Sequence, residues 1–174
     1  DVHGAPTDDG VDHPDGFVTA VFDGATGALV AAIPDTVVWG RADLDNDGYD
    51  EWITSPTSGW SYLDGVAGVR LDCTGACVAE TTWSDPDHTL APDLAELDGV
   101  DFPDLGVHLT DSAGISAADL VAYRGGDVAV LNVDLAGVVS VAGSVPLEDG
   151  EVVYAADAPS GGVALYDGST VRLF

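Results

Sequence analysis

An acidic loop in the first third of the chain has the residue types and the spacing that suit a hard cation. The segment Asp43-Leu44-Asp45-Asn46-Asp47-Gly48-Tyr49-Asp50-Glu51 puts acids at loop positions 1, 3, 5 and 9 and glycine at position 6. Calcium takes about 6–8 oxygen ligands at ~2.3–2.6 Å, and alternate residues of a tight loop can direct carboxylates to one point. Gly48 permits the sharp turn, and the Tyr49 carbonyl offers a further oxygen. The sequence therefore predicts a calcium site made by Asp43, Asp45, Asp47, Tyr49 and Glu51.

The loop differs from an EF-hand on its C-terminal side. An EF-hand requires a glutamate at position 12 and then a helix, whereas this chain has Thr54 there, within the β-like run Glu51–Thr54. The alternative interpretation is an ordinary solvated turn, because Asp, Asn and Gly are common turn residues. Acids on all four ligand positions, with glycine between them, favour a calcium loop that leads into a strand.

Degraded copies of the loop recur along the chain, which indicates internal repeats. Asp9–Asp15 and Asp98–Asp104 match at six of seven positions, and Leu147–Glu151 is a shortened fourth copy. The third copy keeps Glu96, Asp98 and Asp104, and these predict a weaker second metal site. We expect one domain of four repeats, at approximately residues 1–40, 41–92, 93–145 and 146–174.

A second motif recurs along the chain with the same spacing as the copies of the acidic loop. Tyr62-Leu63-Asp64-Gly65 leads to Val69-Arg70-Leu71, and Leu165-Tyr166-Asp167-Gly168 leads to Val171-Arg172-Leu173. Asp-Gly between alternating apolar segments is a strong hairpin signal. Each repeat is therefore expected to contain an acidic loop, a strand, a hairpin and a further strand.

With these two motifs the chain resembles the FG-GAP/VCBS repeat family, the integrin-alpha-like β-propeller repeats with D-x-D-x-D-G-x-x-[DE] calcium loops. Only Asp43–Glu51 matches the loop in full; Val100 stands at a ligand position in the third copy. The resemblance implies calcium ligation by Asp43, Asp45, Asp47 and Glu51 with the Tyr49 carbonyl. It also implies propeller blades and recognition of a protein or glycan at a cell surface.

The rest of the sequence predicts an all-β fold. Short β-type runs alternate with glycine and proline, at Phe17–Phe22, Leu29–Ile33, Val37–Trp39, Glu51–Thr54, Val128–Val133 and Val152–Ala156. Helix is expected for no more than a turn or two, at Ser116–Leu120 and Asp93–Leu97. Many short strands at even spacing predict a propeller, sandwich or barrel. We expect a small propeller-like domain of about four blades, either incomplete or completed by oligomerisation.

The charge excludes several partners. The chain has 31 acids against four arginines and no lysine, for a formal net charge of −27. Nucleic acid and anionic membranes require Lys/Arg patches, so neither is an expected partner. The acids repel one another in the compact state, and calcium or abundant salt would relieve this repulsion.

The two cysteines are informative about the cellular compartment in which the protein works. Cys73 and Cys77 flank Thr-Gly-Ala between two expected strands. A disulfide across that turn would imply an oxidising compartment, whereas a metal site would require more ligands nearby than the sequence offers. The chain begins without a signal peptide or initiator Met, which we interpret as a processed mature form, and it has no 18-residue apolar run. We expect a secreted, extracellular or cell-surface protein.

Catalysis has weak support in the sequence. The histidines are scattered at positions 3, 13, 88 and 108, and no Gly-x-Ser-x-Gly or His-Glu-x-x-His motif is present. Trp60 or Trp83 would stack on a sugar if exposed. The sequence favours a non-catalytic calcium-binding domain for adhesion or recognition. The alternative is a structural subunit that binds copies of itself in a filament or surface layer, and a propeller lyase or hydrolase ranks third.

Overall fold

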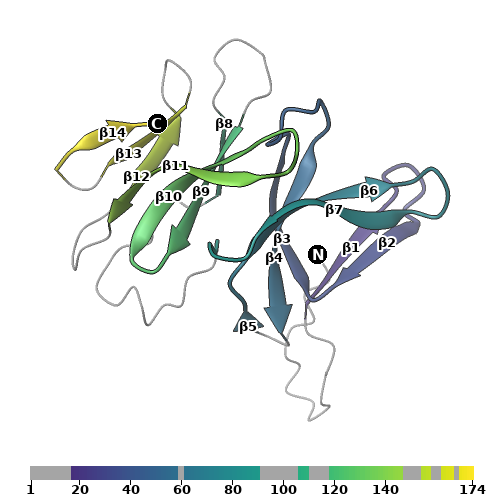
Figure 1. Cartoon of the computed structure of the whole chain (residues 1–174). Coiled ribbons are helices and arrows are strands. Elements are labelled where there is room, and N and C mark those ends of the chain that lie inside the picture. Colours follow the sequence, from purple (N-terminus) through teal and green to yellow (C-terminus); the bar gives the residue numbers. More distant parts are fainter. Residues whose placement is uncertain are drawn as a thin grey trace.

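The computed structural model consists of short antiparallel strands arranged in four sheets (Figure 1). It describes residues 17–58, 61–90, 106–109, 118–146, 154–157, 162–166 and 169–174. The first sheet pairs β1 (Val18–Phe22) with β2 (Leu29–Pro34). The second has the order β3 (Thr36–Ala42), β4 (Glu51–Ser58), β6 (Val66–Asp72), β7 (Val78–Asp85), and β5 (Ser61–Tyr62) also pairs with β4.

The third sheet has the order β11 (Val139–Pro146), β10 (Asp127–Val133), β9 (Ala118–Arg124), β8 (Gly106–Leu109). The fourth has the order β12 (Tyr154–Asp157), β13 (Val163–Tyr166), β14 (Val171–Leu173). None of the described residues belongs to a helix that could cross a membrane. The expected all-β class is therefore confirmed.

Local turn chemistry explains why the strands reverse where they do. Asp23 closes the β1–β2 turn, because its Oδ1 accepts hydrogen bonds from the backbone N–H groups of Ala25 and Thr26 at 3.1 and 2.7 Å. Between β9 and β10, Gly125 and Gly126 both adopt positive φ, 52° and 97°. A two-residue turn with positive φ at both positions matches the right-handed twist of the strands it joins.

The expected helical turn at Ser116–Leu120 is wrong in its described part, because β9 begins at Ala118. The apolar run there belongs to a strand that is buried on both faces. Leu120 and Ala122 face one neighbouring sheet, and Val121 faces the other. A strand covered on both sides shows no alternation of polar and apolar residues, so periodicity alone does not distinguish it from a short helix.

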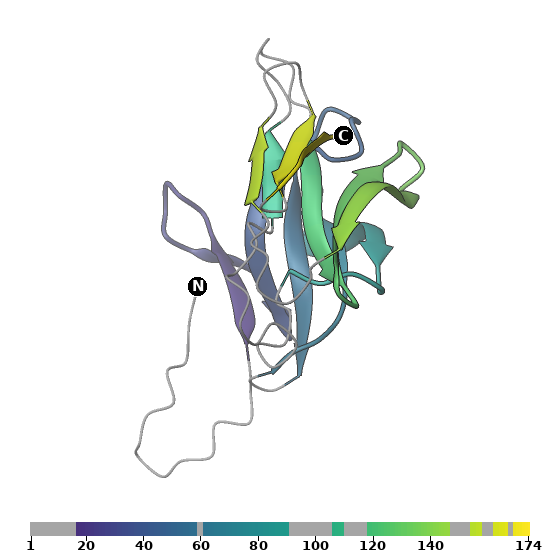
Figure 2. The same ribbon diagram turned by 90° about the vertical axis from the view of Figure 1, so that its left-hand side faces the viewer.

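The sheets succeed one another across the molecule in chain order, from β1–β2 to β12–β14 (Figure 1). Figure 2 shows the purple β1–β2 hairpin projecting beside the blue strands of the second sheet, where β1 contacts β3 and β2 contacts β7. The third sheet lies in the middle of the remaining stack. One apolar cluster joins it to the second sheet, and another joins it to the fourth.

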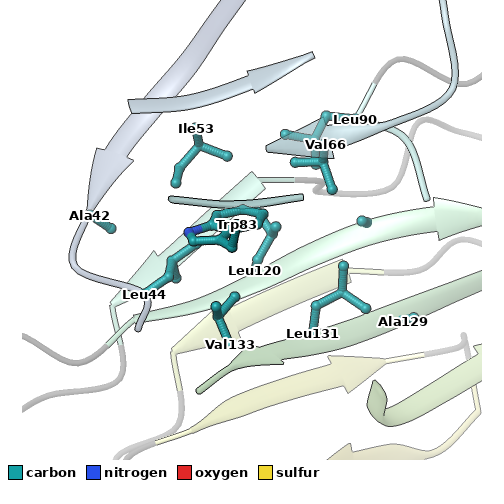
Figure 3. Close-up of a cluster of buried hydrophobic side chains, with 11 residues drawn as sticks. Ala42, Leu44, Ile53, Val66, Trp83, Leu90, Leu120, Ala129, Leu131 and Val133 are labelled. Atoms are coloured by element: carbon teal, nitrogen blue, oxygen red, sulfur yellow. The ribbon is translucent and has the colours of Figure 1, made fainter. Parts of the chain in front are cut away.

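The larger cluster contains Trp83 at its centre, with Ile53 and Val66 from the second sheet and Leu120 and Leu131 from the third (Figure 3). Burial of one such aliphatic side chain contributes about 1.5–3 kcal/mol. The core therefore lies between sheets, and the second sheet is fixed by its contact with the third.

Among the described residues the four sheets remain separate, and no closed propeller or barrel is observed. The third and fourth sheets fall within the expected repeats at 93–145 and 146–174, apart from Pro146 at the end of β11. The second sheet begins at Thr36, before the expected boundary at residue 41.

The Sγ atoms of Cys73 and Cys77 are 2.10 Å apart, at disulfide distance, in the turn between β6 and β7. Because the cysteines are only four residues apart, and Asp72 already pairs with Val78, the bridge closes little additional chain.

Replacing both cysteines with serine is expected to lower the free energy of unfolding by at most about 2 kcal/mol. Denaturant unfolding of the double variant against the oxidised protein measures this loss. A loss beyond ~3 kcal/mol would show that the bridge holds more than its own turn.

Candidate metal centre

The acidic loop connects β3 to β4, and both of its ends are held by the second sheet. Ala42 and Glu51 are partners in the β3–β4 ladder. Leu44 is buried in the large apolar cluster and fixes the first half of the loop to the core. The chain then reverses through Asn46 and Gly48, whose φ values are 58° and 92°. Glycine occupies the position where the φ value is most unfavourable for other residues, as the sequence predicted.

The loop brings three carboxylates together. One ligand oxygen from each of Asp43, Asp45 and Glu51 lies within 4.8 Å of the others, and all three residues are buried. Backbone groups hold this arrangement. The Asp47 N–H donates to Oδ1 of both Asp43 and Asp45 at 3.1 Å, and the Gly48 N–H donates to Asp43 Oδ2 at 2.9 Å.

Burial makes the metal-free cluster electrostatically unfavourable. It raises the pKa of Asp45 and of Glu51 from their ordinary values, and neighbouring carboxylates raise both further. A bound cation would stabilise the ionised forms of both groups. The donor set is made of carboxylate oxygens. Such oxygens suit hard cations such as calcium and magnesium better than they suit softer transition metals. The residues present therefore fit a hard divalent ion.

Asp47, also predicted as a ligand, does not belong to the cluster of three. The Asp47 carboxylate bonds to Arg70, with Oδ2 at 2.8 Å from Nη1, and its Oδ1 accepts the Tyr49 N–H at 2.9 Å. This hydrogen bond to the guanidinium lowers the pKa of Asp47. The Tyr49 side chain is exposed, and the Arg70 guanidinium lies over its ring at 5.2 Å from the centroid.

Arg70 is the residue of this site that sequence reasoning missed. The β4–β6 ladder pairs Trp52 with Val69, the residues next to Glu51 and Arg70 in the chain, and this pairing brings Glu51 and Arg70 close together. Arg70 Nη2 donates to Glu51 Oε1, and this bond together with that to Asp47 raises the pKa of Arg70. The pKa of Glu51 nevertheless remains raised, because burial outweighs the attraction of Arg70.

Two signals in the sequence could have pointed to Arg70. It is one of only four cationic Lys/Arg side chains in the chain, and it lies in the segment Val69-Arg70-Leu71 directly after the hairpin that succeeds the loop. A second arginine, Arg41, pairs with Asp50 at 3.1 Å on the exposed side of the loop. Half of the cationic Lys/Arg side chains are therefore next to this loop.

Several other predicted site residues lie outside the described part of the chain. These are Glu96, Asp98 and Asp104 of the expected weaker site, the loop copies around Asp9 and Glu148, and Trp60. Trp83 is 3% exposed within the core, so the exposure on which sugar stacking depended is not met for this residue.

His88 is also buried, and its Nδ1 is 2.9 Å from Asp85 Oδ2. A buried histidine held by a carboxylate beside the large core is satisfied structurally. No spacing pattern in the sequence indicated this pair.

A separate, open cavity of about 400 Å³ lies over the second sheet, and none of its lining residues comes from the acidic loop. Small side chains such as Ala67, Ala79 and Thr54 line much of it, with Ile33 from β2 at one side. It therefore has no connection to the carboxylate cluster.

Comparison of the chain with protein-family models, with curated proteins and with solved structures finds no match.

Proposed function

We propose that this chain is a calcium-stabilised β-repeat domain of the propeller type, in which the metal fixes the loop between two strands of the second sheet. The convergence of Asp43, Asp45 and Glu51 within 4.8 Å carries the proposal. Through Ala42 and Leu44 the same loop is joined to the core between the second and third sheets. Because the metal-free state holds buried like charges, metal binding contributes directly to the free energy of folding.

The propeller part of the proposal is supported by the stacking of the sheets. Propellers repeat small antiparallel sheets face to face around an axis. Here the second, third and fourth sheets pack face to face in chain order through two apolar clusters. About four blades would account for the four sheets, with the ring either open or completed by another copy.

The proposed role is non-catalytic recognition of a protein or glycan at a cell surface by a secreted protein. The D-x-D-x-D-G-x-x-[DE] loop and its FG-GAP/VCBS-like register support this role, and the disulfide supports an oxidising environment. The net charge of −27 is compatible with a calcium-rich or saline medium.

One observation favours self-association as a second candidate function. Among the described residues β14 is one of the two edge strands of the fourth sheet, and its Val171 and Leu173 are 60% and 65% exposed. An exposed apolar edge strand is a template for pairing with another chain. Size-exclusion chromatography in calcium distinguishes the two functions, since a filament or layer subunit elutes as large assemblies and a recognition domain as a small species.

The calcium proposal is tested by a thermal melt with saturating calcium against excess chelator at the same high ionic strength. Fixed salt separates ligation from general screening of the acidic surface. At free calcium about 100 times the dissociation constant, one site adds ~2.7 kcal/mol. For a chain of this size that gain is expected to raise the melting temperature by about 5–10 °C.

The same melts are made with Asp45→Asn, a variant that keeps the side-chain volume and removes one buried carboxylate. It is expected to abolish most of the shift. An unchanged melting temperature for the unaltered chain in calcium would refute the metal proposal, and magnesium at equal concentration tests the choice of ion.

A further inference from the structure

The Arg70 guanidinium bonds to two of the four carboxylates that the sequence predicts as metal ligands. It bonds to Asp47 Oδ2 and to Glu51 Oε1 at the same time. Glu51 belongs to the cluster of three, whereas Asp47 does not. Arg70 therefore bonds both to one member of the cluster and to the predicted ligand that lies outside it.

The oxygens of these two carboxylates are already engaged. Asp47 Oδ1 accepts the Tyr49 N–H at 2.9 Å and Oδ2 accepts Arg70 at 2.8 Å. Glu51 Oε2 accepts the Leu44 N–H at 3.4 Å, and Oε1 accepts Arg70. For Asp47 to ligate a metal together with Asp43 and Asp45, its carboxylate has to leave the guanidinium.

We propose that Arg70 is a tethered counter-cation that competes with calcium for Asp47 and Glu51. In the metal-free protein it neutralises part of the acidic loop and keeps the loop folded. When calcium binds, the guanidinium is released from Asp47 and loses its hold on Glu51. This inference rests on the proposed calcium site and adds the residue that sets its affinity.

Electrostatics explains why competition is favoured over a role in orienting the ligands. An orienting arginine would remain bonded to its carboxylates in the metal-bound state. Here the guanidinium and a divalent ion would share the same two acids across a distance of a few ångströms, where like charges repel strongly. The Arg70 side chain is 29% exposed and lies over the exposed Tyr49 ring, so outward displacement would carry its guanidinium toward solvent.

Competition has a signature that a merely structural role lacks. Loss of Arg70 is expected to lower the melting temperature of the chelated protein, because Asp47 and Glu51 lose their counter-cation. The same change is expected to strengthen calcium binding, because the metal no longer displaces a bound cation. A structural or orienting residue would weaken both.

The experiment measures calcium dissociation constants by isothermal titration calorimetry for the full chain and two variants, Arg70→Met and Arg41→Met, at one salt concentration. The two variants change the net charge equally and both border the loop. Arg41, however, pairs with the exposed Asp50, which lies outside the cluster of three. We expect Arg70→Met to tighten binding about tenfold or more, and Arg41→Met to tighten it less than about threefold.

Each outcome decides the inference. Binding that is weaker in Arg70→Met, or changed no more than in Arg41→Met, overturns it. If the unaltered chain binds no calcium but Arg70→Met does, the competition is complete: the inference stands while the proposed function of the native loop fails. If neither binds, both fail.

A second measurement uses the unaltered chain and so does not depend on how well a variant folds. The chain has only four arginines and no lysine, so the arginine Nε–Hε groups give few NMR signals. Calcium is expected to shift the Arg70 signal strongly and to leave that of Arg41 nearly unchanged. An Arg70 signal that stays in place at saturating calcium overturns the inference.

Discussion

Gly68→Ala is expected to lower the free energy of unfolding by about 2–3 kcal/mol, because the site has no room for a methyl group. Gly68 lies on β6 opposite Trp83 of β7. A Cβ at this position would overlap the indole Nε1 and would lie 2.8 Å from Cδ1. Trp83 is 3% exposed and packs between the second and third sheets, so its ring has nowhere to move (Figure 3).

Denaturant unfolding of Gly68→Ala measures the loss, and Gly75→Ala is the matched control. Gly75 lies in the turn of the same hairpin, and an added Cβ there meets nothing within 4 Å. We expect the control to stay within about 0.5 kcal/mol of the unaltered chain. If Gly68→Ala unfolds like the control, the indole does not lie on Gly68 and Trp83 does not pack between the two sheets in this way.

Glu51→Gln is expected to abolish calcium-dependent stabilisation while changing the metal-free protein little. Glu51 is fully buried in the cluster of three carboxylates. The amide keeps the volume, and its single oxygen can still accept the hydrogen bond from Arg70, so only the long 3.4 Å bond from the Leu44 N–H loses its acceptor. The neutral amide is a poor calcium ligand. The gain of ~2.7 kcal/mol at free calcium 100 times the dissociation constant should disappear.

The raised pKa of Glu51 explains why the metal-free protein should tolerate this change. A carboxyl whose folded pKa lies above its unfolded value stabilises the fold below that unfolded value. The benefit is lost as the pH rises through the folded pKa. At neutral pH the ionised Glu51 is therefore unfavourable without metal, and its neutral isostere avoids this cost. We expect a change within about 1 kcal/mol.

Thermal melts in calcium and in chelator test Glu51→Gln against Asp50→Asn. Asp50 is the neighbouring acid, but it pairs with Arg41 on the exposed side of the loop and does not belong to the cluster. Asp50→Asn should keep nearly the full calcium shift. A shift that survives in Glu51→Gln would place the metal elsewhere in the chain.

The strands and their turns could be predicted because their causes are local. Glu51–Thr54 and Val128–Val133 were predicted from short apolar or alternating runs, and they form β4 and β10 with boundaries that differ by a few residues. The β9–β10 turn is set by two consecutive glycines. The prediction at Ser116–Leu120 was wrong because burial on both faces depends on neighbouring sheets, which one strand's sequence does not specify.

The candidate site also has one part that could be predicted from the sequence and another that depends on the tertiary structure. By itself, the sequence determined the loop, its tight turn at Gly48 and the convergence of Asp43, Asp45 and Glu51, because nine consecutive residues joined covalently have few ways to reverse between two strands. Only the tertiary structure decided that Arg70 would bond to Glu51 and Asp47, and that Trp83 would fill the space above Gly68. These contacts depend on the register of neighbouring strands in the second sheet, which brings together residues that are 15 to 23 positions apart in the chain.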